Sequence, residues 1–208
     1  MRLTYAEQLT ESLISYLRPA CLRIEAAGSV RRQVEDVGDL EIVAIPDPRP
    51  PRPEFGRPKP FTSKVDELMH HLLEEASVMQ VKAGPKFKQY RIYSSHFGLP
   101  AQTENINLDL FLVTPPADFG VLYLIRTGPA DFSRWMVTQR GKGGPLPDEL
   151  RVQDGAVWRG EEKVSIAEEA DYFKLCGLAY VAPSLRRPAW QYVQEAAVSA
   201  ALQGGIAT

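Results

Sequence analysis

Residues 28–41 read GSVRRQVEDVGDLE, and this stretch connects two apolar runs that both have the composition of β-strands. A Gly-Ser turn opens it, and Asp39 and Glu41 stand at its end, where the second run begins. Because side chains alternate across a strand, both carboxylates point to the same face. Two negative charges so close repel each other, which raises one pKa or requires a cation between them. The sequence favours a cation at this face.

A third carboxylate stands in another strand-like run, NINLDLFLV at residues 105–113. Alternation places Asp109 on one face with Asn107 and Phe111, and three leucines on the other face. An unpaired acid inside an apolar strand costs several kcal/mol unless an ion pair or a metal compensates it. Two explanations therefore stand for Asp109: a salt bridge, or membership of one site with Asp39 and Glu41.

The composition is that of a globular protein. The chain has 208 residues, 44% of them hydrophobic, and can bury a core in one domain or two small subdomains. A net charge of −2 argues mildly against a surface covered with nucleic-acid contacts. The charge is uneven, however, because residues 82–91 contain no acid but four cations, Lys82, Lys86, Lys88 and Arg91. Such a run forms either a local basic groove or an ordinary solvated face.

The sequence shows no sign of membrane insertion or secretion. No apolar run approaches the ~18 residues that span a membrane, and the N-terminus lacks the pattern of a signal peptide. Cys21 and Cys176 have neither metal-ligand spacing nor the density of a disulfide framework. We therefore expect a cytoplasmic protein with no membrane partner.

Hydrophobic periodicity and turn residues predict the elements around these motifs. Helices are expected over residues 4–17, 63–75, 131–140 and 188–202, and from a capping box of Ser165 and Glu168 to about Cys176. Strands are expected over residues 22–27, 39–45, 78–83, 87–93 and 105–113, with a hairpin over 150–158 that turns at Asp154-Gly155. The proline-rich residues 46–60 should form an extended surface loop, which could also dock a partner.

Four motifs occur in order along the chain: Gly28-Ser29-Val30-Arg31-Arg32, Gly38-Asp39-Leu40-Glu41, Leu108-Asp109-Leu110 and Thr127-Gly128-Pro129. This ordered set resembles the family X DNA polymerases, the group of DNA polymerase beta within the nucleotidyltransferase superfamily. The resemblance spans roughly residues 20–187. It implies an α/β (α+β) fold with a palm domain over residues 1–125, built on a mixed, mostly antiparallel sheet flanked by helices. A small α+β subdomain that contacts nucleotide and DNA would occupy residues 126–208.

The same resemblance assigns the site residues. Two Mg²⁺ ions, which Mn²⁺ could replace, would be bound by the catalytic carboxylates Asp39, Glu41 and Asp109. Contacts to the incoming nucleotide would come from Gly28, Ser29, Arg32, Gly38, Arg126, Thr127, Gly128 and Ser133. Contacts to DNA would come from Lys82, Lys86, Lys88, Arg91, Arg134 and Lys142. In the family the Thr-Gly segment contains a cis peptide, and a proline at residue 129 lowers the cost of the cis form to about 0.5–1 kcal/mol.

Some residues depart from the family pattern. Glu41 replaces the aspartate of many relatives, and Arg126 stands where an aromatic residue lies beside the sugar, which puts discrimination against ribonucleotides in doubt. Asn107 replaces a basic residue near the primer. We also expect no lyase domain and no helix-hairpin-helix module, because the sequence begins only one helix before the catalytic strand.

The function expected from the resemblance is metal-dependent addition of nucleoside monophosphates from dNTPs to a DNA 3′-hydroxyl, in short gaps during DNA repair. The protein would act as a monomer on primer-template or gapped DNA, in a bacterium or a virus-infected cell. One alternative is a nucleotidyltransferase with another acceptor, such as RNA, a protein or a nucleotide. Another is a non-catalytic DNA-binding scaffold, in which the three carboxylates merely neutralise Arg31 or Arg32.

Overall fold

The computed structural model describes residues 1–49, 63–99, 106–187 and 191. The helix expected over residues 188–202 and most of the proline-rich segment 46–60 lie outside the described residues. No helix in the described ranges is long and apolar enough to cross a membrane.

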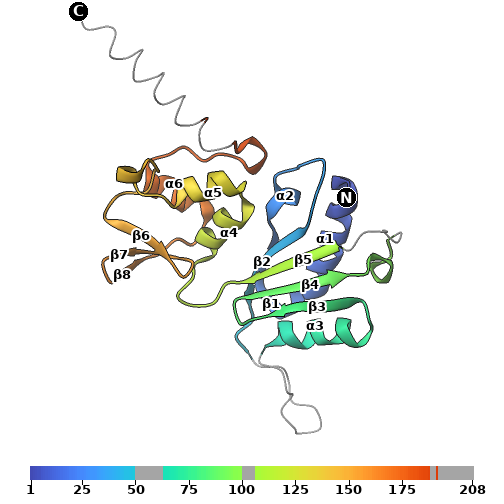
Figure 1. The fold of residues 1–208 in the computed structure, drawn as a ribbon. Helices are drawn as coiled ribbons and strands as arrows, with labels where there is room; N and C mark the ends of the chain where they lie inside the picture. Colours follow the sequence, from blue (N-terminus) through green and yellow to red (C-terminus); the bar gives the residue numbers. More distant parts are fainter. Residues whose placement is uncertain (50–62, 100–105, 188–190, 192–208) are drawn as a thin grey trace, which may run out of the picture.

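A five-stranded sheet forms the centre of the N-terminal part of the chain (Figure 1). Its strands stand in the order β1 (Cys21–Ala26), β2 (Leu40–Pro46), β5 (Ile106–Leu112), β4 (Phe87–Ile92) and β3 (Val78–Ala83). Only β2 and β5 pair in parallel, and the other neighbours are antiparallel. The expected mixed, mostly antiparallel sheet and the α+β class are therefore confirmed.

Two helices, α1 (Leu3–Leu17) and α3 (Lys64–Glu74), cover one face of this sheet. In α1 the apolar residues recur at helical spacing, and Leu9, Leu13 and Leu17 are fully buried. Helix α3 begins at Ser63, whose hydroxyl accepts a hydrogen bond from the Asp66 amide at 3.1 Å. Short 3₁₀ helices follow α1 and β4, at η1 (Arg18–Ala20) and η2 (Ser94–Phe97). This face is the apolar one, so the polar residues of the strands lie on the other.

The C-terminal lobe, residues 119–187, has a core of its own around Phe132, Tyr172 and Phe173. It contains α4 (Phe119–Thr127), α5 (Ala130–Met136), η3 (Arg140–Lys142), β6 (Leu150–Gln153), β7 (Ala156–Arg159), β8 (Glu162–Val164), α6 (Glu169–Cys176) and η4 (Pro183–Leu185). The three strands form a small antiparallel sheet. Its first turn is the predicted Asp154-Gly155 turn, where both residues have positive φ.

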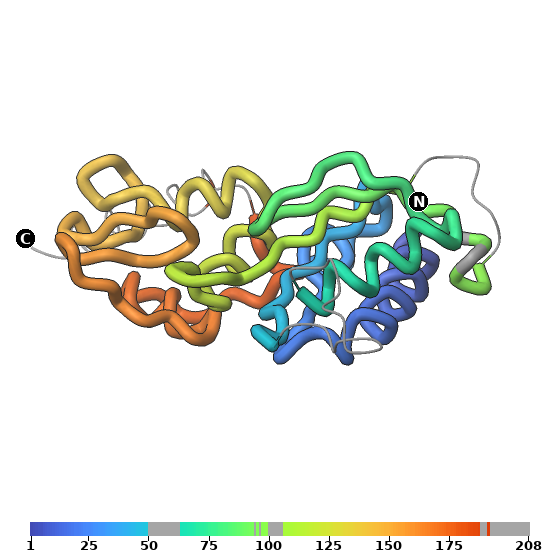
Figure 2. The backbone as a smooth tube through the Cα atoms, turned by 90° about the horizontal axis from the view of Figure 1, so that it is seen from below, coloured from blue at the N-terminus to red at the C-terminus, as the bar shows by residue number. Residues whose placement is uncertain are grey.

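Helix α4 joins the C-terminal lobe to the second face of the large sheet. Phe119 from this helix packs with Val43 and Phe111 in a small apolar cluster. Figure 2 shows the result: the large sheet and the C-terminal lobe lie side by side along the long axis of the molecule. The polar residues of this face lie next to the apolar cluster that the lobe covers, since Glu41 and Asp109 are two residues before Val43 and Phe111 on their strands.

Several local predictions were wrong. Helix α5 ends at Met136 rather than residue 140, because the next side chains make non-helical contacts: the Gln139 amide donates to the carbonyls of Asp148 and Leu150, at 2.9 Å each. The capping box of α6 consists of Glu168 and Asp171, not Ser165 and Glu168. Strand β2 begins at Leu40, so Asp39 immediately precedes it. Strand β8 was not predicted.

Candidate active site

The three carboxylates lie at one end of the polar face of the large sheet. Glu41 on β2 stands directly opposite Asp109 on β5, and Asp39 lies two residues before Glu41. All three are half-buried, whereas the intervening Leu40 and the flanking leucines of β5 are buried on the other face. The parallel pairing of β2 with β5 therefore brings together acids that are far apart in the sequence.

The acids influence one another electrostatically. Burial, together with the negative charge of Asp39, raises the pKa of Glu41 to about 7, although the charge of Arg126 opposes this shift. Burial and the negative charge of Asp109 likewise raise the pKa of Asp39 above its ordinary value. Asp109 itself accepts a hydrogen bond from the Gln89 amide at 2.8 Å. Within the described ranges, no cationic group lies within the 4.0 Å ion-pair distance of any of the three carboxylates.

The Glu41 carboxylate lies against the Gly-Ser turn. Gly28 has a φ of +58°, and a Cβ atom placed there would lie 2.0 Å from Glu41 Oε2. No three acidic, histidine or cysteine side chains in the described part of the chain surround a common point as metal ligands do. The donors are nevertheless hard oxygens, the type that Mg²⁺ and Mn²⁺ prefer. Binding a cation between all three would require the Glu41 carboxylate to turn away from Gly28.

The Gly-Ser turn is a single helical turn, α2 (Gly28–Arg31), rather than an irregular loop. The Ser29 hydroxyl oxygen is buried and has no hydrogen-bond partner in the described part of the chain. Leaving a buried hydroxyl unsatisfied costs about 1–3 kcal/mol. The turn thus carries an unused hydrogen-bonding group beside the carboxylates.

The two arginines after the turn contact the C-terminal lobe. Arg32 donates a hydrogen bond to the Thr127 carbonyl and lies against Gly128, where an added Cβ would be 3.1 Å from its Nη1. Burial lowers the pKa of Arg32, while the charge of Glu41 opposes this shift. The peptide bond between Gly128 and Pro129 is cis, as predicted. The segment named by the resemblance therefore lies directly beside Arg32.

Arg31 is held by residues that the sequence did not single out. Its guanidinium forms two hydrogen bonds with Glu169, at 2.7 and 3.0 Å, and a third with the Thr127 hydroxyl. Glu169 also pairs with Arg186 at 2.7 Å and accepts a hydrogen bond from Tyr180. Glu169 and Arg186 are buried. In the sequence Glu169 belongs to a run of acids typical of a solvated surface, so no local signal predicted this network.

Arg126 joins the carboxylate end of the sheet, whereas two other predicted nucleotide contacts do not. The guanidinium carbon of Arg126 lies 4.0 Å from the centre of the Phe111 ring, next to the Glu41–Asp109 pair along the strands. Thr127 is fully buried, and its hydroxyl donates to the Tyr123 carbonyl. Ser133 is also buried and donates to the Ile125 carbonyl. The side chains of Thr127 and Ser133 therefore hold the C-terminal lobe together.

The predicted DNA contacts divide between the two faces of the sheet. Gln89 and Arg91 stand opposite Asp109 and Asn107 in register, so they share the carboxylate face, and Lys82 pairs with Gln89 on the neighbouring strand. Lys88 points the other way: it is 8% exposed and forms an ion pair with Asp66 at 2.7 Å. A charge buried and neutralised in this way cannot contact DNA, so Lys88 is withdrawn from the predicted set.

The other predicted cations are accessible. Lys86 lies 3.8 Å from Asp154, and both side chains are about half exposed. The Arg134 side chain is 79% exposed and makes only a long contact with Asp131, at 3.8 Å. Lys142 is exposed in the loop after α5. Gly38 is exposed too, with nothing within 4 Å of an added Cβ. These residues remain accessible to a ligand.

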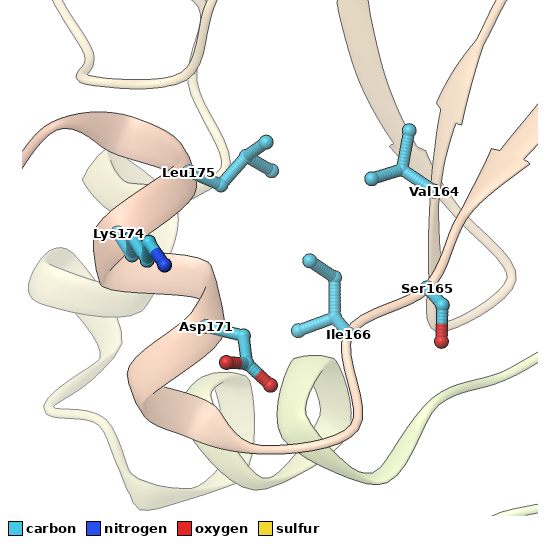
Figure 3. Close-up of a pocket in the computed structure, with 6 residues that line it drawn as sticks. All are labelled: Val164, Ser165, Ile166, Asp171, Lys174 and Leu175. Carbon is cyan, nitrogen blue, oxygen red and sulfur yellow. The ribbon is translucent and has the colours of Figure 1, made fainter.

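A pocket of about 390 Å³ lies elsewhere, between β8 and α6 (Figure 3). Its lining is apolar where the side chains of Val164, Ile166 and Leu175 face it, and the Ser165 hydroxyl points away from it. The carboxylate of Asp171, at its edge, accepts a hydrogen bond from the Glu168 amide and serves to cap α6. The pocket contains none of the predicted site residues.

One end of the polar sheet face thus contains the three carboxylates, the Gly-Ser turn, Arg32 and Arg126. It lies beside the segment around Gly128. The exposed Lys82 of β3 and the half-buried Arg91 of β4 lie on the same face. No model of a known protein family matches the sequence, and comparison with curated proteins finds no match either.

Proposed function

We propose that this protein is a metal-dependent nucleotidyltransferase that adds nucleoside monophosphates from dNTPs to the 3′-hydroxyl of DNA, filling short gaps. One observation carries the proposal: three half-buried carboxylates adjoin on one sheet face with no protein cation at ion-pair distance in the described ranges. Repulsion among such groups favours a bound cation. The motif resemblance then favours nucleotidyl transfer over other metal-dependent reactions.

Phosphoryl transfer depends mainly on positioning and on neutralising charge. When bound by Asp39, Glu41 and Asp109, two Mg²⁺ ions would neutralise the triphosphate and favour ionisation of the attacking hydroxyl. Asp109 is positioned for this role because Gln89 already holds its Oδ1 atom. The other oxygen of Asp109 remains to accept the proton of the 3′-hydroxyl.

The triphosphate would lie over α2. The Ser29 hydroxyl lacks a partner there, and phosphate oxygens are strong acceptors. Arg32 adds a planar cation beside the turn, fixed by its bond to the Thr127 carbonyl. Arg126, stacked on Phe111, adds a second cation on the other side of the carboxylates. A polyanion bound here would meet donors from both parts of the chain.

The DNA backbone would follow the exposed cations. Lys82 and the half-buried Arg91 lie on the carboxylate face, and Lys86, Arg134 and Lys142 are further accessible cations. Each such cation strengthens binding to phosphates in a salt-dependent way. The scaffold alternative is less favoured, since Arg31 is already neutralised by Glu169 and does not need the three carboxylates.

Primer extension with gapped, recessed and single-stranded DNA tests the proposal, with dNTPs and ribonucleotides offered separately. We expect Mg²⁺- or Mn²⁺-dependent extension that is fastest on gaps. Asp109→Asn should reduce kcat by a factor of about 10² to 10⁴, since it removes a metal ligand and the acceptor of the 3′-hydroxyl proton. The matched control is Asp131→Asn, which changes an exposed acid on α5 and should retain activity. Extension that Asp109→Asn leaves unchanged would overturn the proposal.

A further inference from the structure

The segment that leads from α2 to Asp39 is largely exposed. It comprises residues 33–38, and every one of them except Val37 is exposed. Val37 is only 1% exposed and packs in the core cluster that contains the apolar face of α1. Asp39 therefore lies between two buried residues, Val37 before it and Leu40 after it.

The backbone of this segment is held by the residues around the start of α1. An isolated antiparallel β-bridge joins the segment to the residue that precedes the helix. On its two sides the Leu3 amide donates to the Glu35 carbonyl at 2.9 Å, and the Val37 amide donates to the Met1 carbonyl at 2.8 Å. The bridge therefore fixes the backbone up to two residues before Asp39.

The Leu3 amide is available for this bond because of its place in the helix. Leu3 is the first residue of α1, and the first amides of a helix have no partner within it. Arg2, the N-cap residue, forms no capping hydrogen bond with its side chain. The loop thus supplies the acceptor that a capping side chain supplies in other helices. One hydrogen bond both completes the start of the helix and places the loop.

We propose that residues 1–3 are positioning residues for Asp39, which hold the loop so that its carboxylate is presented to a divalent cation. A ligand fixed in advance loses less conformational freedom when the cation binds. Gly38 has nothing within 4 Å of an added Cβ, so the bridge removes a freedom that this glycine would otherwise give the chain. The inference rests on the proposed function, in which Asp39 binds Mg²⁺ or Mn²⁺.

Leu3→Pro tests the bridge selectively. Proline is well tolerated as the first residue of a helix, but it has no amide hydrogen, so the bond to Glu35 is lost. Arg2 has φ −69° and ψ 146°, the extended conformation that a residue before proline requires. Leu3→Ala is the matched control, because it also removes the leucine side chain but keeps the amide.

Mn²⁺ binding, followed by electron paramagnetic resonance with no nucleotide or DNA present, gives a readout other than activity. We expect Leu3→Pro to bind Mn²⁺ about 3- to 10-fold more weakly than Leu3→Ala, a change that corresponds to one hydrogen bond. Hydrogen exchange of the Val37 amide should become faster in the same variant. Equal Mn²⁺ affinity in the two variants would overturn the inference, because a bridge that only stabilises the fold leaves the affinity of the folded protein unchanged.

A second pair of variants keeps the test independent of proline. Val37 and Val78 are buried valines of the same core cluster, 1% and 3% exposed, and Val78 lies on β3, away from the bridge. Val37→Ala should weaken Mn²⁺ binding, whereas Val78→Ala should leave it unchanged. Equal weakening in both would overturn the inference, since general loosening of the core would then explain it. Failure of the native protein to bind Mn²⁺ at all would instead contradict the proposed function.

Discussion

At the scale of single residues, the position of Gly28 links the turn to the carboxylates. Its φ of +58° is a conformation that L-residues rarely adopt, and the Glu41 carboxylate occupies the space that a side chain would need. Glycine is therefore required here for two reasons: the backbone has a positive φ, and a side chain would clash with Glu41. Gly38, which was also predicted to contact the nucleotide, has neither a positive φ nor any atom within 4 Å of an added Cβ.

Gly28→Ala should consequently destabilise the protein by about 1–2 kcal/mol, because an L-residue would have to adopt the left-handed backbone conformation. It should also displace the Glu41 carboxylate. Urea unfolding measures the first effect, and nucleotide addition measures the second. Gly38→Ala is the matched control and should change the free energy of unfolding by less than about 0.5 kcal/mol. Equal losses in the two variants would contradict the structural difference between these glycines.

Glu41 should make stability depend on pH. Its pKa is about 7 in the folded protein and 4.5 ordinarily, so the folded state binds more protons than the unfolded state between these values. Stability contributed by this group is therefore lost as the pH rises from about 4.5 to 7. Glu41→Gln removes the titration and should make the protein about 1–3 kcal/mol more stable than native at pH 8 without divalent cations.

Urea unfolding of both proteins at pH 4, 6 and 8, with a chelator present, checks this expectation. The difference between them should nearly vanish at pH 4, where native Glu41 is protonated in both states. A difference that is the same at all three pH values would show that the substitution acts through packing rather than charge.

At the scale of elements, helices α2 and α6 are joined through Glu169. This residue forms ion pairs with both Arg31 and Arg186, whose side chains are 16% and 0% exposed. Removing one partner of a buried ion pair leaves an uncompensated charge, which costs about 3–5 kcal/mol. Glu169→Gln should therefore destabilise the protein by this amount in urea unfolding.

The neighbouring Glu168 provides the control. It pairs with Arg23 at 2.6 Å, a comparably short distance, but its side chain is 57% exposed. Glu168→Gln should cost only about 1 kcal/mol, most of it from the lost cap of α6, because solvent screens exposed pairs. If the two variants lost equal stability, burial would not be what makes the Glu169 network strong.

The sequence predicted the elements of the large sheet well because their signals are local. Alternation identified the buried leucines of β5, and the same rule placed Asp109 on the opposite face. The capping box of α6 was misassigned because Ser165 with Glu168 and Glu168 with Asp171 have the same spacing. Only the three-dimensional path of the chain distinguishes them.

At the scale of the whole molecule, the candidate site was predicted in part. The carboxylates, Arg32 and Arg126 come from separate motifs, and the structure brings them together. The Glu169–Arg186 network and Gln89 were not predicted from the sequence. Lys88 was misassigned because all the charged residues of the run 82–91 are basic, while the pleat of β4 turns Lys88 toward Asp66 on the other face. Contacts between distant segments have no signature in a single sequence.

The parallel pair of β2 and β5 also has a consequence for how the chain folds. A helix and a hairpin separate these strands in the sequence, so pairing them closes a long loop, a step that slows folding. The same step brings Glu41 and Asp109 together. Formation of this strand pair therefore works against the repulsion of two carboxylates, and an ion that screens these charges should favour the pairing step as well as stabilise the finished protein.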